Sequence, residues 1–337
     1  MTKSEDAMLT MLDRAVSEGG APGILAEVRA GDRVWSGQRE RSPEDRFRIG
    51  SISKTFTATV LLQLVAENRL SLDDPAGQWL PGLVEHADEI SVRRLLNHTS
   101  GVFNYTQDQV ALSQRETYTP HQLVEVAAAH PADFEPGAGW AYSNTNYVLA
   151  GLIAERVTGR DLADEIADRV CRPLGLAATR LPHAGDETLG EPHSAHFTKL
   201  FSPDPDAEIH DVTLLEPSPY WAAGGMVSTA GELLRFFGAL LGGRLLPPEQ
   251  TRALFDAVPT RDWLPDAAYG LGICSLKLPG GSEVWGMAGA LFGSWTYVFG
   301  SRDGAHLVAA NINADWAAGP WSDPGEVLAD LLVAEFG

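Results

Sequence analysis

The sequence predicts a fold of the α/β class (α+β type), in which a mostly antiparallel sheet, flanked by N- and C-terminal helices, carries an inserted all-helical lobe. Three observations support this prediction: strand patterns lie near both ends of the chain, helical patterns fill its middle, and a helical pattern stands at each terminus. Strands from both ends can pair in one sheet, while the helices between them bury their apolar faces in a second lobe.

The first elements are a helix and a hairpin. Residues 1–20 mix charged and apolar residues at helical spacing and therefore predict an amphipathic helix. Residues 24–29 and 33–37 flank Ala30-Gly31-Asp32 and predict an antiparallel hairpin. The helical patterns of the middle then cover residues 54–68, 91–96, 120–129, 146–158, 161–170 and 231–241.

A second hairpin and a closing helix complete the pattern. Residues 294–299 and 306–311 bracket a turn that contains Asp303-Gly304, which is a strong hairpin signal. Residues 325–336 predict the closing helix. These elements predict one sheet domain made of two separate segments and one inserted helical domain, which cover residues 1–58 with 226–337 and residues 59–225.

The segment 182–219 is predicted to form an irregular cover over the site, because it holds six prolines among polar residues. It also contains His193 and His196, which are three residues apart, a spacing that can suggest a metal. No other histidine of the segment stands at a recognised ligand spacing from this pair. We therefore expect no metal and no cofactor.

The charge balance restricts the partners. The 337 residues include 45 acidic and 25 basic residues, a formal net charge of −20. Such a charge repels nucleic acid and anionic membranes, although it also serves solubility in a crowded cytosol. We therefore expect no nucleic-acid and no membrane partner, and favour neutral or cationic small molecules.

The expected location is the cytoplasm. Residues 1–20 carry no secretory pattern, and no stretch reaches transmembrane length. The two cysteines, Cys171 and Cys274, lie far apart and indicate no disulfide framework.

The motif Ser51-Ile52-Ser53-Lys54 opens a long apolar helix. Residues three apart on a helix share one face, and a partly desolvated lysine has a lowered pKa, so Lys54 can take the proton of the Ser51 hydroxyl. A serine activated in this way is a known nucleophile. Taken alone the motif is weak, because Ser-x-x-Lys occurs roughly once by chance in a chain this long, and Ser51 also suits a helix N-cap.

Two further tracts strengthen the motif. The tract from Asp45 to Lys54, together with Leu95-Leu96-Asn97-His98-Thr99-Ser100-Gly101 and Tyr142-Ser143-Asn144-Thr145-Asn146-Tyr147, resembles the class C β-lactamase family. The resemblance is greatest to its D-alanyl-D-alanine carboxypeptidase branch, a serine-hydrolase group similar to penicillin-binding proteins. It extends from about Gly23 to the C-terminal helix, with the blocks in the family's order. The family layout places the catalytic cleft between the two lobes.

The resemblance implies a role for each motif residue. Ser51 is the expected nucleophile, Lys54 its proton acceptor and Tyr142 a second proton-handling group. Because an ammonium favours a neighbouring phenolate, we expect Tyr142 and Lys54 to share a proton near neutral pH. Asn144 is expected to donate a hydrogen bond to the acyl part of the substrate, or alternatively to cap a helix.

The resemblance also implies an oxyanion hole and a lined pocket. The backbone N–H groups of Ser51 and Ala290 are the expected oxyanion donors. The aromatic positions expected to line the pocket are Phe103, Tyr105 and Trp221, although each also suits an ordinary core.

The sequence departs from the family at its third motif. The family presents a cation and a hydroxyl before a glycine, whereas this chain has Met287-Ala288-Gly289. After Tyr269-Gly270-Leu271-Gly272, where the closest carboxypeptidases bind the substrate carboxylate with an arginine, it has Cys274. Each lost charge-assisted hydrogen bond is worth about 1.5–3 kcal/mol. We expect these four substrate-binding positions, Met287, Ala288, Gly289 and Cys274, to have lost carboxylate recognition.

The predicted function is therefore a serine acyl-transfer enzyme, an esterase, amidase or transacylase. It is expected to act on a small neutral ester or amide through an acyl-Ser51 intermediate, with water or an amine or alcohol as acceptor. The alternative is a D-alanyl-D-alanine carboxypeptidase or β-lactamase whose carboxylate anchor is Lys277 or Arg302. A third reading is a non-catalytic binding or sensor module, which the complete Ser51, Lys54 and Tyr142 set argues against.

Overall fold

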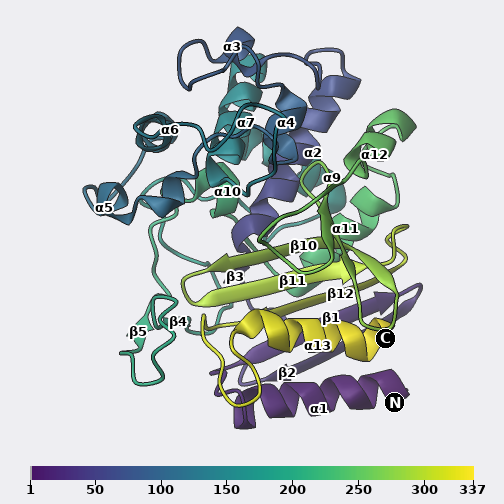
Figure 1. The fold of residues 1–337 in the computed structure, drawn as a ribbon. Coiled ribbons are helices and arrows are strands. Elements are labelled where there is room, and N and C mark those ends of the chain that lie inside the picture. Colours follow the sequence, from purple (N-terminus) through teal and green to yellow (C-terminus); the bar gives the residue numbers. More distant parts are fainter. Residues whose placement is uncertain (1) are drawn as a thin grey trace.

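An eight-stranded antiparallel sheet forms one half of the molecule in the computed structural model, which describes residues 2–337 (Figure 1). The strand order is β2-β1-β12-β11-β10-β9-β8-β7. The strands are β1 (Ile24–Ala30), β2 (Arg33–Arg39), β7 (Val258–Pro259), β8 (Ala267–Tyr269), β9 (Cys274–Lys277), β10 (Glu283–Leu291), β11 (Ser294–Gly300) and β12 (His306–Ile312).

The two ends of the chain meet in this sheet. Strand β1 pairs with β12 from Ile24 opposite Ile312 to Ala30 opposite His306, so the N-terminal hairpin extends the C-terminal one. This pairing confirms the predicted fold class, a mostly antiparallel sheet assembled from both termini.

Helices cover both faces of the sheet (Figure 1). They are α1 (Lys3–Ser17), α11 (Ala230–Leu241) and α13 (Pro324–Phe336). Ala26, Ala310 and Tyr297 are direct partners across β1, β12 and β11, so their side chains share one face, which α1 and α13 cover. Glu27 points to the opposite face, toward Gly231 of α11. The predicted amphipathic helix over residues 1–20 corresponds to α1, and Met1 lies outside the described residues.

The second lobe is built around two long helices, α2 (Ser53–Ala66) and α7 (Asn144–Thr158), which pack against each other. Both are apolar on nearly every side and largely buried, as the sequence predicts for α2. Shorter helices surround them: α3 (Ala76–Trp79), α4 (Val92–Leu96), α5 (Gln109–Leu112), α6 (Pro120–Ala128), α8 (Leu162–Ile166), α9 (Arg172–Leu174), α10 (Trp221–Gly224) and α12 (Pro248–Leu254).

The remaining elements are short. Three are single turns or short helices: η1 (Gly50–Ile52), η2 (Tyr105–Gln107) and η3 (Ala167–Cys171). The others are two-residue strands that pair as β3 (Phe47–Arg48) with β6 (Val227–Ser228) and as β4 (Phe197–Thr198) with β5 (His210–Asp211).

The structure differs from the predicted elements in three places. The segment 59–225 is not purely helical, because β4 and β5 lie within its irregular part. The helix predicted over 161–170 is divided into α8 and the wider turn η3. The proposed boundary between residues 58 and 59 falls inside the continuous helix α2, so the division into two domains stays a prediction. Across residues 2–337, none of the helices combines the length and apolar character needed to cross a membrane.

Candidate active site

Ser51 lies in η1, the turn directly before α2. The alternative interpretation of Ser51 as a helix N-cap is wrong, because α2 begins at Ser53 and the cap position belongs to Ile52, which makes no side-chain cap bond. Two side chains instead contact the Ser51 hydroxyl. Lys54 Nζ lies 3.0 Å from Ser51 Oγ, and the Tyr142 hydroxyl donates to the same oxygen at 2.7 Å.

Lys54 is fully buried beneath Ser51. Besides Ser51 Oγ, its Nζ contacts Asn144 Oδ1 at 2.7 Å and the Ala223 carbonyl oxygen at 2.6 Å. Burial lowers the pKa of Lys54 well below its usual 10.5 and favours the neutral amine. A neutral amine has two N–H donors, which suit the two carbonyl-type oxygens, so its lone pair is left to face the Ser51 hydroxyl.

Tyr142 does not have the pKa that the sequence suggested. We expected a neighbouring ammonium to lower it, but burial raises the pKa of Tyr142 well above its usual value of 10. Its ring stacks on Trp263 at 5.6 Å between centroids and lies 4.5 Å from the His98 ring. In this apolar setting Tyr142 is a neutral phenol that donates to Ser51, rather than a phenolate sharing a proton with Lys54.

Asn144 fixes the position of Lys54. It is the first residue of α7, and the cap position belongs to Ser143, so the alternative interpretation of Asn144 as the N-cap is wrong. Its Oδ1 accepts from Lys54, while its Nδ2 donates to Thr106 Oγ1 at 3.1 Å. One N–H of the amide thus remains for a bond to a substrate.

Strand β10 passes directly beside the Ser51 turn. A Cβ atom added to Gly50 would lie 2.8 Å from the Ala290 backbone N, and one added to Gly289 would lie 2.0 Å from the Ile49 carbonyl oxygen. Strand β9 pairs only with residues 283–286 of β10, so the edge of β10 beyond them is left to face Ser51.

Along β10, every second backbone N–H group points toward this edge. The Ala288 N–H approaches the Cys274 thiol and lowers its pKa, although burial has the larger effect and raises it. Because backbone N–H groups on one side of a strand recur every second residue, the Ala290 N–H faces the same edge. Ser51 and Ala290 therefore offer two adjacent backbone donors.

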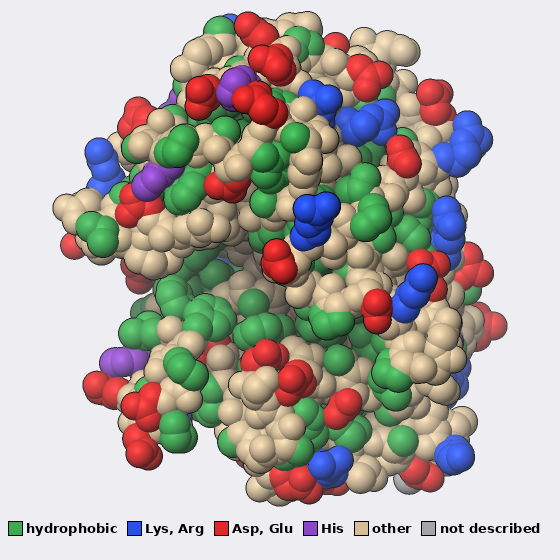
Figure 2. Space-filling model, in the orientation of Figure 1, with side chains coloured by type: hydrophobic (Ala, Val, Ile, Leu, Met, Phe, Trp, Pro, Cys, Tyr) green, Lys and Arg blue, Asp and Glu red, His purple; other side chains and the backbone are tan. Residues whose placement is uncertain are grey.

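Two cavities meet at Ser51, and both are also lined by Asn144 and Ala290. The larger one, here called the large cavity, has about 450 Å³ and an apolar wall that includes Leu112, Phe201, Tyr220, Leu291 and Phe292. The small cavity has about 280 Å³ and is lined by Tyr142, Trp263, Leu264, Trp295 and Tyr297. Figure 2 shows the hollow between the lobes, in which hydrophobic side chains gather. Within residues 2–337, no Lys, Arg, His, Asp or Glu side chain lines either cavity.

The predicted pocket residues divide into two groups. Tyr105 lines the large cavity, and Ala288 and Gly289 line the small one. Phe103 instead stacks on His130 at 4.1 Å, and Trp221 lies against Gly151 of α7. These two aromatic residues therefore do not contact the large or the small cavity.

The two replaced carboxylate positions are also away from the cavity walls. Met287 and Cys274 are completely buried in the core, on β10 and β9. The proposed alternative anchors lie elsewhere: Lys277 is exposed at the end of β9, and the Arg302 guanidinium stacks over Phe255 at 4.6 Å. None of these four side chains lines the space around Ser51.

Sequence reasoning did not assign His98 a role. Its ring is completely buried, and its Nδ1 accepts from the Ser143 N–H at 3.2 Å and from Asn146 Nδ2 at 3.1 Å. His98 therefore supports both the start of α7 and the ring of Tyr142. The tract from Leu95 to Gly101 marked this segment, but nothing in its spacing indicated the contact.

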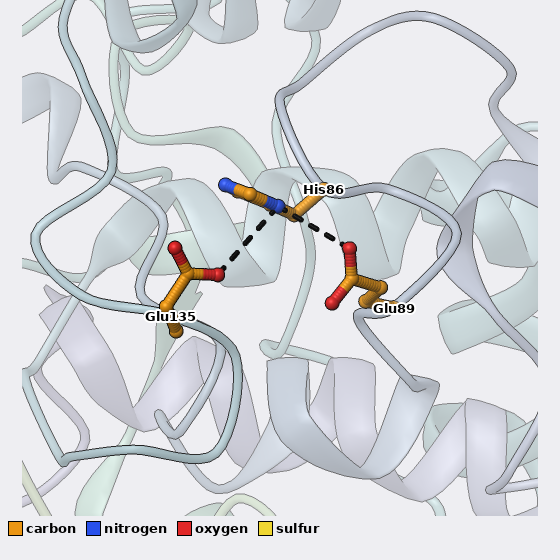
Figure 3. A group of neighbouring side chains, drawn as sticks. All are labelled: His86, Glu89 and Glu135. Carbon is orange, nitrogen blue, oxygen red and sulfur yellow. Dashed lines mark hydrogen bonds and ion pairs between the residues drawn. The ribbon is translucent and has the colours of Figure 1, made fainter.

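The described part of the chain contains one group with three metal-ligand side chains close together, formed by His86, Glu89 and Glu135 (Figure 3). His86 Nδ1 lies 3.4 Å from Glu89 Oε1 and 3.8 Å from Glu135 Oε2, and both glutamates are exposed. The group lines neither cavity at Ser51. His193 pairs with Glu191, whereas His196 is buried and donates to the Gly293 carbonyl oxygen, so these two histidines share no ligand set.

Comparison with known proteins gives consistent matches. A family model described as Beta-lactamase matches residues 10–319. A solved D-stereospecific amidohydrolase from Streptomyces sp. is 44% identical, with a TM-score of 0.90 and 98% of each chain covered. The D-amino acid amidase from Ochrobactrum anthropi SV3 is 26% identical, with a TM-score of 0.87 and 99% of each chain covered.

Among curated proteins, esterase EstB from Burkholderia gladioli is 30% identical over 232 residues, which are 60% of this chain and 59% of that protein. The chain spans little more than half the length of the curated relatives it matches, from 54% to 59% for three of them.

Proposed function

The chain belongs to the Beta-lactamase family of serine hydrolases, and from this premise we propose that it cleaves neutral amides or esters through an acyl-Ser51 intermediate. The observation that carries the proposal is the contact of Ser51 Oγ with both Lys54 and Tyr142 between two uncharged cavities. A nucleophile held between a neutral amine and a phenol has a base on one side and an acid on the other.

In the acylation step, Lys54 takes the proton of the Ser51 hydroxyl as Oγ attacks the substrate carbonyl. The N–H groups of Ser51 and Ala290 stabilise the oxyanion that forms. When the carbon–nitrogen or carbon–oxygen bond breaks, the Tyr142 hydroxyl gives its proton to the leaving group. The products are the acyl enzyme, an ammonium on Lys54 and a phenolate on Tyr142, which attract each other.

Deacylation reverses both proton transfers. Tyr142 takes a proton from the incoming water, whose oxygen attacks the acyl carbonyl, and Lys54 returns its proton to Ser51 Oγ as that oxygen leaves. Each residue thus regains its starting state. An amine or alcohol acceptor in place of water follows the same proton balance.

The position of Tyr142 indicates which cavity would receive the leaving group and which the acyl group. Tyr142 lines the small cavity but not the large one, and a group that protonates the leaving group must lie on its side of the carbonyl. The small cavity therefore receives the leaving group, and the large cavity the acyl group. Both groups are neutral and apolar, because a carboxylate buried without a partner loses its hydration with no compensating contact.

The relatives suggest a narrower class. Two solved structures that match nearly the whole chain are named a D-stereospecific amidohydrolase and a D-amino acid amidase, and a further relative is named an esterase. We therefore favour an amide whose acyl group has a D-configured α-carbon, which the N-acetyl derivatives of D- and L-phenylalanine amide distinguish as a pair of neutral substrates.

The test of the proposed function uses two aryl esters with the same phenylacetyl group, 3-(phenylacetoxy)benzoic acid and its methyl ester, so that only the leaving group differs. We expect the neutral methyl ester to acylate Ser51 at least about tenfold faster, because charge-assisted partners worth about 1.5–3 kcal/mol are missing for the carboxylate. Acylation is followed by intact-protein mass spectrometry at matched substrate concentrations. Faster acylation by the free carboxylate would contradict the proposal and indicate a carboxypeptidase.

The contact between β10 and the Ser51 turn gives a second prediction. Gly289→Ala is expected to lower kcat by about 10²-fold, because the new Cβ forces the Ala290 N–H away from the reacting oxygen, and displacements near 1 Å have effects of this size. Gly280→Ala is the control, since its Cβ would meet nothing nearer than 3.6 Å. Equal kcat values for the two variants would contradict the role of the Ala290 N–H as an oxyanion donor.

A further inference from the structure

A tight turn of unusual composition borders the large cavity. The Ser202 N–H donates to the Lys199 carbonyl oxygen at 3.0 Å, and the two residues between them, Leu200 and Phe201, both have φ of +56°. Two central residues with positive φ define a type I′ turn, which normally takes asparagine, aspartate or glycine. Large apolar residues in these positions are strained.

The surroundings impose this conformation. The buried carboxylate of Asp315 accepts from the Lys199 N–H at 2.9 Å and from the Thr198 hydroxyl, which in turn accepts from the Leu200 N–H at 2.8 Å. The Lys199 side chain donates to the Pro205 carbonyl oxygen. Strained backbone persists where the structure fixes it in this way, and such places are often functional.

The side chains of the two strained residues differ in their contacts. The ring of Phe201 lies 5.3 Å from that of Phe292 and 6.1 Å from that of Trp295, and it lines the large cavity. Leu200 is 59% exposed and lines neither cavity. The strained turn thus presents one aromatic ring to the cavity that receives the acyl group.

We propose that Phe201 is a specificity-determining residue, whose ring selects substrates with a bulky apolar acyl group, an aryl-alkyl acyl group being the best fit. This inference rests on the proposed function. With Phe292 and Leu291 on the same cavity, Phe201 supplies an apolar surface that a ring can cover, whereas a small acyl group leaves this surface in contact with water. Phe201 therefore affects how strongly the enzyme prefers a large apolar acyl group over a small one.

The experiment compares two neutral esters with one leaving group, p-nitrophenyl acetate and p-nitrophenyl 3-phenylpropionate. The measured quantity is the ratio of their kcat/KM values, phenylpropionate over acetate. Phe201→Ala is expected to lower this ratio about tenfold, since it removes the ring surface that the phenyl group covers. Phe201→Leu, which keeps part of this surface, is expected to lower it about threefold.

Leu200→Ala is the matched control, because it truncates the neighbouring side chain in the same strained turn, and it is expected to leave the ratio unchanged. A general disturbance of the turn would lower both kcat/KM values equally. An unchanged ratio in Phe201→Ala and Phe201→Leu would overturn the assignment while leaving the proposed function intact. A wild-type protein that hydrolyses neither ester would overturn both.

Discussion

Ser51→Ala is expected to abolish turnover, with kcat lower by about 10⁶-fold, which is the loss that follows removal of the nucleophile in other serine hydrolases. Both Lys54 and Tyr142 contact Ser51 Oγ, so the substitution removes the atom on which the proposed base and the proposed acid act. Steady-state hydrolysis and intact-protein mass after incubation with substrate measure the loss. A variant that keeps more than about a hundredth of the wild-type kcat would contradict the mechanism.

The fold of this variant should be unaffected. Ser51 borders both cavities, so the Tyr142 hydroxyl, which loses its acceptor, and the Lys54 amine, which loses its donor, can turn to water, and the expected change in unfolding free energy is about 1 kcal/mol. Ser113→Ala is the matched control, because Ser113 lines the large cavity and its hydroxyl donates to the Val110 carbonyl oxygen, away from the Ser51 contacts. It is expected to retain activity.

Lys54→Met is expected to lower kcat/KM by about 10³-fold, because it keeps the length of the side chain but removes the general base. In the wild type only the neutral amine accepts the Ser51 proton, so kcat/KM rises with pH through the pKa of Lys54. Burial moves that pKa well below 10.5, and the acid limb of the profile moves with it. The raised pKa of Tyr142 keeps its phenol protonated below about pH 10. A pH–rate profile of Lys54→Met that retains the acid limb would assign the limb to another group.

The same pKa makes stability depend on pH. In the unfolded chain Lys54 keeps its proton up to about pH 10.5, whereas in the folded protein it loses the proton at lower pH. Between these two values the unfolded state binds more protons, so the free energy of unfolding rises with pH by about 1.4 kcal/mol per unit. Urea denaturation at several pH values should find this contribution absent in Lys54→Met and present in Lys277→Met, which replaces an exposed lysine.

Much of the fold could be predicted from the sequence because its signals are local. The two hairpins, the helix at each end and the apolar helix after Ser51 all follow from periodicity and turn residues. The predicted boundary at residue 58 lies inside α2, because the apolar pattern of this helix continues without a break from Ser53 to Ala66.

The candidate site was predicted where a motif supplied the spacing, as with Ser51 and Lys54. Of the aromatic residues at the cavities, Tyr105 was predicted, but Trp263 and Phe201 were not, and Phe103 and Trp221 were predicted there and lie elsewhere. All of these residues are equally aromatic in the sequence, and long-range packing alone decides which of them reaches a cavity. The predicted lowering of the Tyr142 pKa was wrong for a related reason. The sequence indicates the nearby lysine but not the burial, which has the larger effect and raises the pKa.

The packing of β10 against the Ser51 turn has a consequence for biosynthesis. Ser51, Lys54 and Tyr142 leave the ribosome long before Gly289 and Ala290, and the strand β12 that anchors the N-terminal hairpin emerges later still. Contacts between residues so distant in the chain form late in folding. The nascent polypeptide therefore carries the proposed nucleophile, Ser51, before the proposed oxyanion donor, Ala290, has been made, and the proposed activity requires synthesis to have passed β12.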